Sequence, residues 1–352
     1  MNRRLSLLAA ALAAAVLAAG CGEKEETTTA PDAEHVRLML DYLPNADHAG
    51  IYAAREGGAF ERAGLDVEIQ TPPDPAAPLK LLASGRADIA ISYEPEVLLA
   101  RDKGLKVVSI GALVQRPLTS IMSVPASDGK DKQQAAPVRS VADLEGKTVG
   151  TAGIPYQSAY LKTILDEAGI DPGSVREVNV GFNLVPAMLS KRVDATLGAF
   201  WNVEGVELQR AKRDPVIIPV DEAGVPTYDE LVLVAREEDA RERGPMLRAF
   251  LRALAQGHQA VRDDPDAGVD ALVKANPDLD RDDTLAQVEA TLPAFFPSHE
   301  DEPFGWQDQR AWGRYGGWMD DNGLLEQAPS PLSLTNEFLP GVGLQQDEAP
   351  AN

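Results

Sequence analysis

Short apolar runs alternate with longer, helix-like stretches along most of this 352-residue chain. Residues 35–41 and 65–70 alternate between apolar and polar positions, as half-buried strands do. Residues 50–63 lie between these runs and predict a helix, and Gly64 follows them where a glycine commonly ends a helix. Strands that alternate with helices in this way predict a mostly parallel sheet with helices on its faces.

The same alternation continues to about residue 235, and the pattern after that point is helical. Further strands are predicted at residues 89–92, 107–114, 147–151, 176–180, 195–199, 216–220 and 231–235. Helices are predicted in the tail at residues 245–262, 265–275, 281–292 and 308–322. The polar stretch 125–138 interrupts the alternation and predicts a surface loop.

One pattern occurs twice, 106 positions apart: Ser-Gly-Arg-Ala-Asp at 84–88 and Ser-Lys-Arg-Val-Asp at 190–194. Each copy follows an apolar helical run and precedes a short apolar strand. Ligands of open α/β sheets bind at the carboxyl ends of the strands, so a duplicated unit predicts two sheets with a binding cleft between their rims. A chance likeness between two ordinary helix–turn–strand units is the alternative.

The order of these elements predicts an α/β protein with two lobes. Residues 35–120 and 231–352 are expected to form lobe one, and residues 121–230 to form lobe two. A lobe inserted into another, with a helical tail that packs back on the first, is the layout of the type II periplasmic binding proteins. The two passages of the chain between the lobes would act as a hinge.

The first twenty residues have the pattern of an export signal. A basic start with Arg3 and Arg4 precedes an apolar stretch and a small-residue cleavage site. Cys21, the only cysteine, would then be the lipid-modified first residue of the mature chain, and residues 21–34 a flexible tether. The expected location is the extracytoplasmic face of the cell membrane. A thiol after a transmembrane anchor is the alternative, for which the apolar run is short.

The composition argues against several functions. The net charge of −22 and the lack of a basic stripe argue against a nucleic-acid partner. The four histidines have no paired spacing, so no metal site is expected. No phosphate-binding glycine loop, nucleophile elbow or zinc-protease motif is present. We therefore expect neither a cofactor nor an enzyme.

Polar and aromatic residues gather at the ends of the predicted strands. The candidate ligand-binding residues are Asp41, Tyr42, Asn45, His48, Ser92, Tyr93, Glu94, Glu96, Tyr156, Trp201, Asn202 and Glu204. Aromatic rings on two facing lobes would sandwich a flat ring, and carboxylates would accept hydrogen bonds from its amino group. This set favours an amino-heterocycle over a sulfonate or nitrate, which would need arginines or backbone donors.

Several of these residues also have a structural interpretation. His48 would then be a satisfied buried histidine, Asp41 a cap of its own turn, and Glu96 a partner of a helix dipole. Trp201 is the strongest single candidate for ligand contact. The late aromatics Trp306, Trp312, Tyr315 and Trp318 are expected to pack the tail helix onto lobe one.

Five segments together resemble one family of proteins. They are residues 40–50 (LDYLPNADHAG), 64–67 (GLDV), 85–88 (GRAD), 92–96 (SYEPE) and 199–205 (AFWNVEG). The chain resembles, over residues 36–340, the thiamine-pyrimidine (NMT/THI-like) family of substrate-binding lipoproteins of ABC transporters. The resemblance implies a monomeric receptor that passes formylaminopyrimidine or hydroxymethylpyrimidine to a permease and an ATPase; riboflavin or a sulfonate such as taurine is the alternative cargo. By the same resemblance, the pocket would be lined by Tyr42, Asn45, Tyr93, Glu94, Trp201 and Glu204.

The same superfamily includes a fungal enzyme that builds the thiamine pyrimidine from pyridoxal phosphate and one of its own histidines. That enzyme needs a lysine just after the strand of the first repeat and a histidine four residues later, and this chain has Ser92 and Glu96 at those places. No cysteine follows Cys21, so the enzyme's cysteine cluster is missing too. The chain lacks the amine for a Schiff base and the atom donor, which favours a binding protein.

Overall fold

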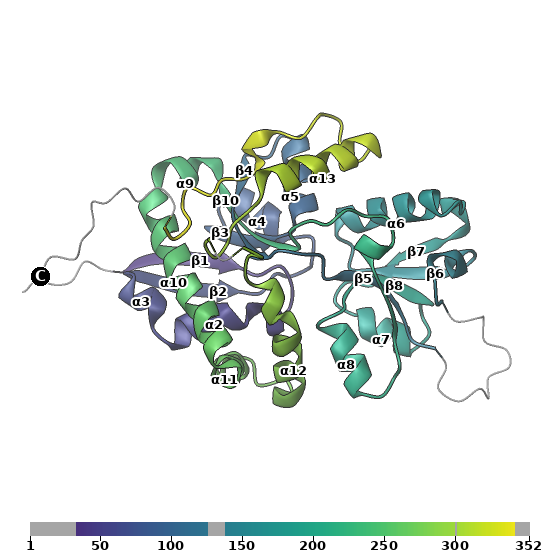
Figure 1. The fold of residues 1–352 in the computed structure, drawn as a ribbon, viewed down its shortest axis with the longest axis horizontal. Coiled ribbons are helices and arrows are strands. Elements are labelled where there is room, and N and C mark those ends of the chain that lie inside the picture. The colour runs from purple at the N-terminus through teal and green to yellow at the C-terminus, as the bar shows by residue number, and fades with distance from the viewer. Residues whose placement is uncertain (1–32, 126–137, 300, 342–352) are drawn as a thin grey trace, which may run out of the picture. The chain divides into compact units, whose positions relative to one another are not determined.

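The computed structural model describes residues 33–125, 138–299 and 301–341 (Figure 1). The predicted signal peptide, Cys21 and nearly all of the tether lie outside these residues. Among the described helices, none has both the length and the apolar character needed to cross a membrane.

The first sheet has the strand order β2-β1-β3-β10-β4. It consists of β1 (Glu34–Met39), β2 (Leu65–Gln70), β3 (Ile89–Ser92), β4 (Val107–Val114) and β10 (Leu231–Arg236). The strands β1, β2 and β3 are parallel, and β10 runs antiparallel to both of its neighbours. All of β3 and all of β10 except Arg236 are buried, because helices cover this part of the sheet on both faces.

Helices from two distant parts of the chain surround this sheet. They are η1 (Ala46–His48), α2 (Ala49–Glu56), α3 (Ala59–Arg62), α4 (Pro78–Ala83), α5 (Glu94–Asp102), α9 (Glu237–Glu242), α10 (Gly244–Asp263), α11 (Pro265–Ala275), α12 (Arg281–Thr291) and α13 (Gln309–Asp321). The prediction of a single helix over residues 50–63 is wrong. It breaks into α2 and α3 at Gly58, whose φ of 68° lies in the left-handed region that glycine tolerates.

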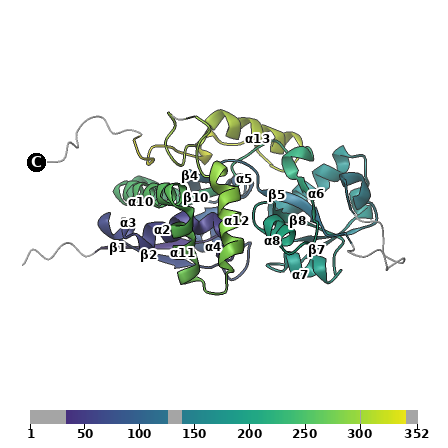
Figure 2. The same ribbon diagram turned by 60° about the horizontal axis from the view of Figure 1, so that its bottom comes forward.

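The helix α10 packs closely along α2, and the two lie side by side in both views (Figures 1 and 2). A Cβ atom at Gly257 would lie 2.1 Å from the carbonyl oxygen of Gly50, so the crossing requires glycine there. This contact joins the C-terminal tail to the first part of the chain.

The second sheet has the strand order β7-β6-β8-β5-β9. It consists of β5 (Thr119–Ser123), β6 (Thr148–Thr151), β7 (Arg176–Asn179), β8 (Ala195–Phe200) and β9 (Val216–Pro219). Its helices are α6 (Pro155–Glu167), α7 (Leu184–Leu189) and α8 (Glu204–Arg210). As in the first sheet, three parallel strands adjoin one antiparallel strand that comes from another part of the chain. The prediction of two α/β sheets is confirmed.

The duplicated sequence pattern has the same structure in both sheets. The backbone N–H of Asp88 donates to Arg37 O at 2.9 Å, and the N–H of Arg37 donates back to Asp88 Oδ2 at 2.9 Å. Asp194 and Thr148 form the same reciprocal pair, both at 2.8 Å. The repeated aspartate therefore joins the beginning of one strand, β3 or β8, to the parallel strand beside it, at the end of that strand opposite to the carboxyl-terminal rim.

Candidate functional site

A cavity lies between the carboxyl-terminal strand ends of the two sheets. It is lined by Asp41, Tyr42, Asn45 and Tyr93 from the first lobe, and by Ile154, Tyr156, Gln157, Gly198, Phe200 and Glu204 from the second. The volume of about 10 Å³ is room for about one water molecule. A larger ligand would therefore enter only when side chains or the lobes move apart.

Asp41 organises the first-lobe side of this cavity. Its Oδ2 accepts a hydrogen bond from the Tyr93 hydroxyl at 2.9 Å, and its Oδ1 lies 2.9 Å from His48 Nε2. The backbone N–H of Asn45 donates to His48 Nδ1 at 3.1 Å, so Nδ1 is an acceptor and Nε2 carries the proton that Asp41 accepts. His48 is thus a structural residue that fixes the carboxylate, and the carboxylate fixes the ring of Tyr93.

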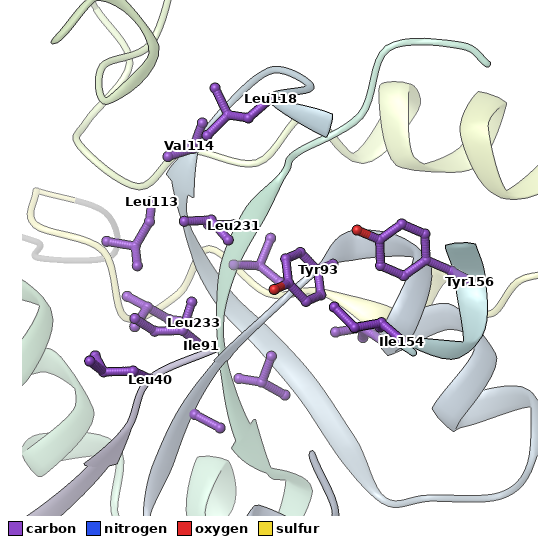
Figure 3. Close-up of a cluster of buried hydrophobic side chains, with 14 of the residues drawn as sticks. Leu40, Ile91, Tyr93, Leu113, Val114, Leu118, Ile154, Tyr156, Leu231 and Leu233 are labelled. Atoms are coloured by element: carbon purple, nitrogen blue, oxygen red, sulfur yellow. The ribbon is translucent and has the colours of Figure 1, made fainter. Parts of the chain in front are cut away.

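Two tyrosine rings of the first lobe meet aromatic rings of the second. Tyr42 contacts Phe182 edge-on, with the ring centroids 4.8 Å apart, and Tyr93 lies 5.4 Å from Tyr156. Figure 3 shows Tyr93 and Tyr156 beside Ile154, above the crossing strands. The Tyr42 hydroxyl is buried without a hydrogen-bond partner in the described residues, and burial raises the pKa of this phenol above its usual range. The hydroxyl therefore keeps its proton and can donate a hydrogen bond at the edge of the cavity.

Glu204 is the carboxyl of the second-lobe side. It stands at the start of α8, where its Oε2 accepts a hydrogen bond from the backbone N–H of Phe200 at 2.7 Å. Burial raises the pKa of Glu204 to about 7. Near neutral pH this group therefore exists both as an acid, which donates and accepts, and as a carboxylate, which only accepts.

Six of the predicted site residues do not line the cavity: His48, Ser92, Glu94, Glu96, Trp201 and Asn202. The Trp201 indole points to residues 115–118, the first passage between the lobes. There its N–H donates to Pro117 O at 3.0 Å, and the Arg116 guanidinium lies 5.2 Å from the ring. Glu94 accepts a hydrogen bond from the N–H of Asp229 at 2.8 Å.

Four lining residues were not anticipated: Ile154, Gln157, Gly198 and Phe200. Gln157 Oε1 accepts a hydrogen bond from the backbone N–H of Ala152 at 2.9 Å. Gly198 has a φ of 118°, and a Cβ atom there would lie 2.2 Å from Gln157 Nε2. A glycine inside an apolar strand signals a close approach, and this signal was available in the sequence.

Two of the late aromatics contact the second lobe, in addition to the predicted packing of the tail helix onto lobe one. Trp318 lies 6.0 Å from Tyr160 of α6, which belongs to the second lobe, and the Tyr315 hydroxyl is hydrogen-bonded to that of Tyr160. Tyr228 lies in residues 223–230, the second passage between the lobes, and its ring is 5.1 Å from that of Tyr315. The tail helix α13 therefore contacts both lobes beside the passages.

A buried carboxyl that the sequence did not single out joins the two passages. Glu230 Oε2 accepts hydrogen bonds from the backbone N–H groups of Leu118 and Thr119, at 2.7 and 2.8 Å, and from the Tyr228 hydroxyl at 3.0 Å. Its Oε1 accepts from Thr119 Oγ1 at 2.9 Å. Burial raises the pKa of Glu230 to about 7, although these hydrogen bonds act to lower it.

Comparisons with known proteins agree with this architecture. The family described as NMT1/THI5 like matches residues 45–268. A formylaminopyrimidine-binding protein of Halalkalibacterium halodurans is 39% identical over 309 residues, which are 86% of this chain and 90% of the relative. A putative thiamine biosynthesis protein of Haemophilus influenzae is 36% identical over 244 residues, 69% of this chain and 74% of the relative.

Among solved structures, the alkanesulfonate-binding protein SsuA from Xanthomonas axonopodis pv. citri superposes with a TM-score of 0.66. The match covers 87% of this chain and 99% of that protein at 17% identity. A likeness at this identity concerns the fold, which is that of the type II periplasmic binding proteins.

Proposed function

The chain belongs to the NMT1/THI5-like family, and from this premise we propose that it is the receptor of an ABC importer for an aminopyrimidine precursor of thiamine. The cargo would be formylaminopyrimidine or hydroxymethylpyrimidine. The observation that carries the proposal is the cavity between the two rims, which combines three tyrosine rings with the buried carboxyl of Glu204.

The chemistry of Glu204 suits the edge of an aminopyrimidine. On such a ring an amino group, which donates hydrogen bonds, adjoins a ring nitrogen, which accepts them. A carboxyl whose pKa is about 7 accepts from the first and, in its acid form, donates to the second. The flat faces of Tyr42 and Tyr93 supply apolar area for the ring, once the lobes have opened enough to admit it.

The lining of the cavity argues against the alternative of a sulfonate. None of the residues that line it in the described structure is an arginine or a lysine. A sulfonate is held by such cations or by backbone N–H donors, and the described lining offers no cation. The structural likeness to a sulfonate-binding protein therefore supports the fold and not the cargo.

The family also contains enzymes of pyrimidine synthesis, and the site supports binding instead. Ser92 stands where the fungal enzyme has its lysine, and it offers no amine for a Schiff base. Neither Ser92 nor Glu96 lines the cavity. We propose that the chain binds the pyrimidine and does not make it.

The anchoring of the receptor is part of the proposal. Cys21 would carry the lipid, which would hold the protein at the extracytoplasmic face of the membrane beside the permease and ATPase. The support is the basic, apolar and small-residue pattern of residues 1–21. Metabolic labelling with a radioactive fatty acid should mark the chain but not its Cys21→Ser variant, and equal labelling of both would contradict this assignment.

A thermal-shift panel tests the cargo. We expect formylaminopyrimidine or hydroxymethylpyrimidine to stabilise the purified protein, by about 2.7 kcal/mol at a ligand concentration one hundred times the Kd. Riboflavin and taurine are the comparison ligands. A shift with riboflavin or taurine, without a shift with either pyrimidine, would overturn the proposed cargo.

A further inference from the structure

Three buried side chains join the lobes beside the cavity. Asn202, in the turn between β8 and α8, donates from Nδ2 to Asp47 Oδ1 of η1 at 2.7 Å. The same nitrogen donates to the hydroxyl of Thr291, at the end of α12, at 2.6 Å. All three residues are fully buried. The hydrogen bond between Asp47 and Asn202 therefore links the second lobe to the first, and neither side chain is exposed to solvent.

The remaining oxygen atom of each group has no partner. Asp47 Oδ2 and Asn202 Oδ1 are both buried without a hydrogen bond among the described residues. A carboxylate oxygen and an amide oxygen are both acceptors, so they cannot satisfy each other. A protonated carboxyl changes this, because its O–H donates to the amide oxygen while its other oxygen accepts from the amide N–H. The two groups then form a ring of two hydrogen bonds.

The surroundings favour the protonated form of Asp47. Burial raises the pKa of this carboxyl well above its ordinary value, and the charges of Asp41, Glu204 and Glu230 raise it further, whereas the bond from Asn202 lowers it. His48, the next residue, is hydrogen-bonded to Asp41, and burial lowers the pKa of His258 on α10 to about 4. Four ion pairs of α8, α11, α12 and α2 lie near the surface: Arg210–Asp283, Arg281–Asp266, Arg281–Asp270 and Lys274–Glu56. The helix α8 also carries Glu207, whose pKa burial raises.

We propose that Asp47 and Asn202 form a latch that closes the lobes with the uptake of one proton. The proton binds to Asp47 Oδ2, which then donates it in a hydrogen bond to Asn202 Oδ1. When the lobes separate, water solvates both groups and Asp47 loses the proton. Because the closed form binds the additional proton, closure weakens as the pH rises from the ordinary pKa of an aspartate to the raised pKa of the closed form. Above that raised pKa the dependence ends.

Titration calorimetry tests the latch, with formylaminopyrimidine as the probe, a ligand that rests on the proposed function. Binding is measured at one pH in two buffers of different ionisation enthalpy, which gives the number of protons taken up with the ligand. We expect Asp47→Asn, a neutral isostere, to take up fewer protons than the wild type, by up to about one per ligand. Between the two pKa values, each rise of one pH unit should weaken ligand binding by the wild type. The ratio of the wild-type affinity to that of the variant should fall by up to about tenfold per pH unit.

Asp283→Asn is the matched control, since it makes the same substitution in the exposed inter-lobe pair with Arg210. It should keep the wild-type proton uptake. Equal uptake by the wild type and Asp47→Asn would overturn the latch. If no pyrimidine binds, the proposed function fails, and small-angle X-ray scattering of the ligand-free protein decides on the latch. Wild-type protein should then expand as the pH rises while Asp47→Asn does not, and identical profiles would overturn the proposal.

Discussion

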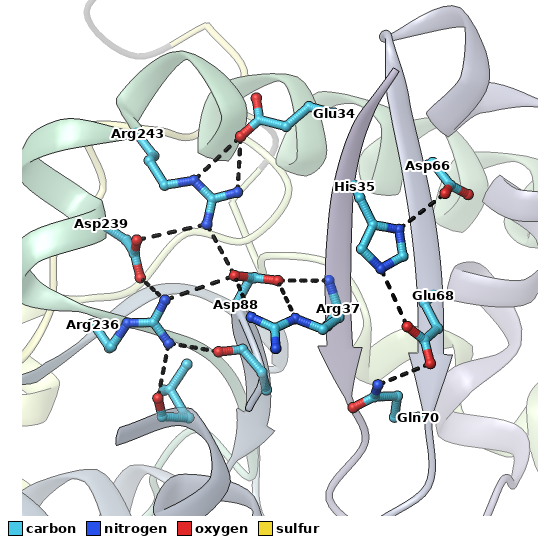
Figure 4. Close-up of polar contacts among 12 residues, drawn as sticks. Glu34, His35, Arg37, Asp66, Glu68, Gln70, Asp88, Arg236, Asp239 and Arg243 are labelled. Atoms are coloured by element: carbon cyan, nitrogen blue, oxygen red, sulfur yellow. Dashed lines mark hydrogen bonds and ion pairs between the residues drawn. The ribbon is translucent and has the colours of Figure 1, made fainter. Parts of the chain in front are cut away.

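Replacement of Asp88 by asparagine should destabilise the first lobe far more than the same change at its counterpart in the repeat. Asp88 is almost fully buried, and three arginines lie around it (Figure 4). Arg37 and Arg243 donate to it at distances of 2.9 to 3.1 Å, and an Arg236 nitrogen lies 3.7 Å away. Asp194 has the same backbone bond, but it is exposed and pairs with no arginine in the described part of the chain.

The structure gives the size of this effect. Burial acts to raise the pKa of Asp88, but the hydrogen bonds from Arg37 and Arg243 outweigh it and hold the pKa at about 2, against an ordinary 3.8. That difference corresponds to about 2 kcal/mol of folding free energy at pH 7. The amide of the Asp88→Asn variant would in addition point an N–H group at guanidinium donors, so we expect a total loss of about 3 kcal/mol. The Asp194→Asn variant should lose about 1 kcal/mol or less.

Urea unfolding measures the two losses of stability. It is followed by both fluorescence and circular dichroism, because a free energy of unfolding can be derived only if the two probes show the same transition. The folded-state pKa of Asp88 is depressed, so its contribution is complete above the unfolded pKa and is lost as the pH falls from about 4 toward 2. The difference between wild type and Asp88→Asn should therefore shrink below pH 4. Equal losses for the two asparagine variants at pH 7 would refute the role given to the arginines.

Three further substitutions separate binding from stability. Glu204→Ala should weaken pyrimidine binding by about 2 kcal/mol, measured by calorimetry, because a buried hydrogen-bonding carboxyl is lost; unchanged affinity would remove Glu204 from the site. Tyr93→Phe leaves Asp41 Oδ2 without its donor and should lower the free energy of unfolding by about 1–3 kcal/mol in a urea titration; a change within about 0.5 kcal/mol would contradict this role. Trp201→Ala should reduce the stability of the ligand-free protein by about 2 kcal/mol and change the affinity less than about threefold. A selective loss of binding would instead restore Trp201 to the ligand pocket.

The sequence predicted the two sheets because strand and helix periodicities are local properties of the chain. The repeated Ser-x-Arg-x-Asp pattern was informative for a reason that only the structure reveals. Each aspartate bonds to the strand beside it, so its position is set by strand pairing and not by the ligand.

The site could be predicted only in part, since the end of a strand does not fix the direction of the side chains that follow. Trp201 and Glu204 follow the same strand, yet the indole turns to Pro117 and the carboxyl lines the cavity. Glu230 was missed because its partners, Leu118 and Thr119, are more than a hundred residues away in the sequence. Only the folded chain brings the two passages together.

A crystal structure of the protein with formylaminopyrimidine tests the central claim most directly. We expect the pyrimidine ring between the two lobes, in contact with the rings of Tyr42 and Tyr93, and its amino edge within hydrogen-bond distance of the Glu204 carboxyl. A pyrimidine bound outside this cavity, or one bound inside it with no contact to Glu204, would contradict the account.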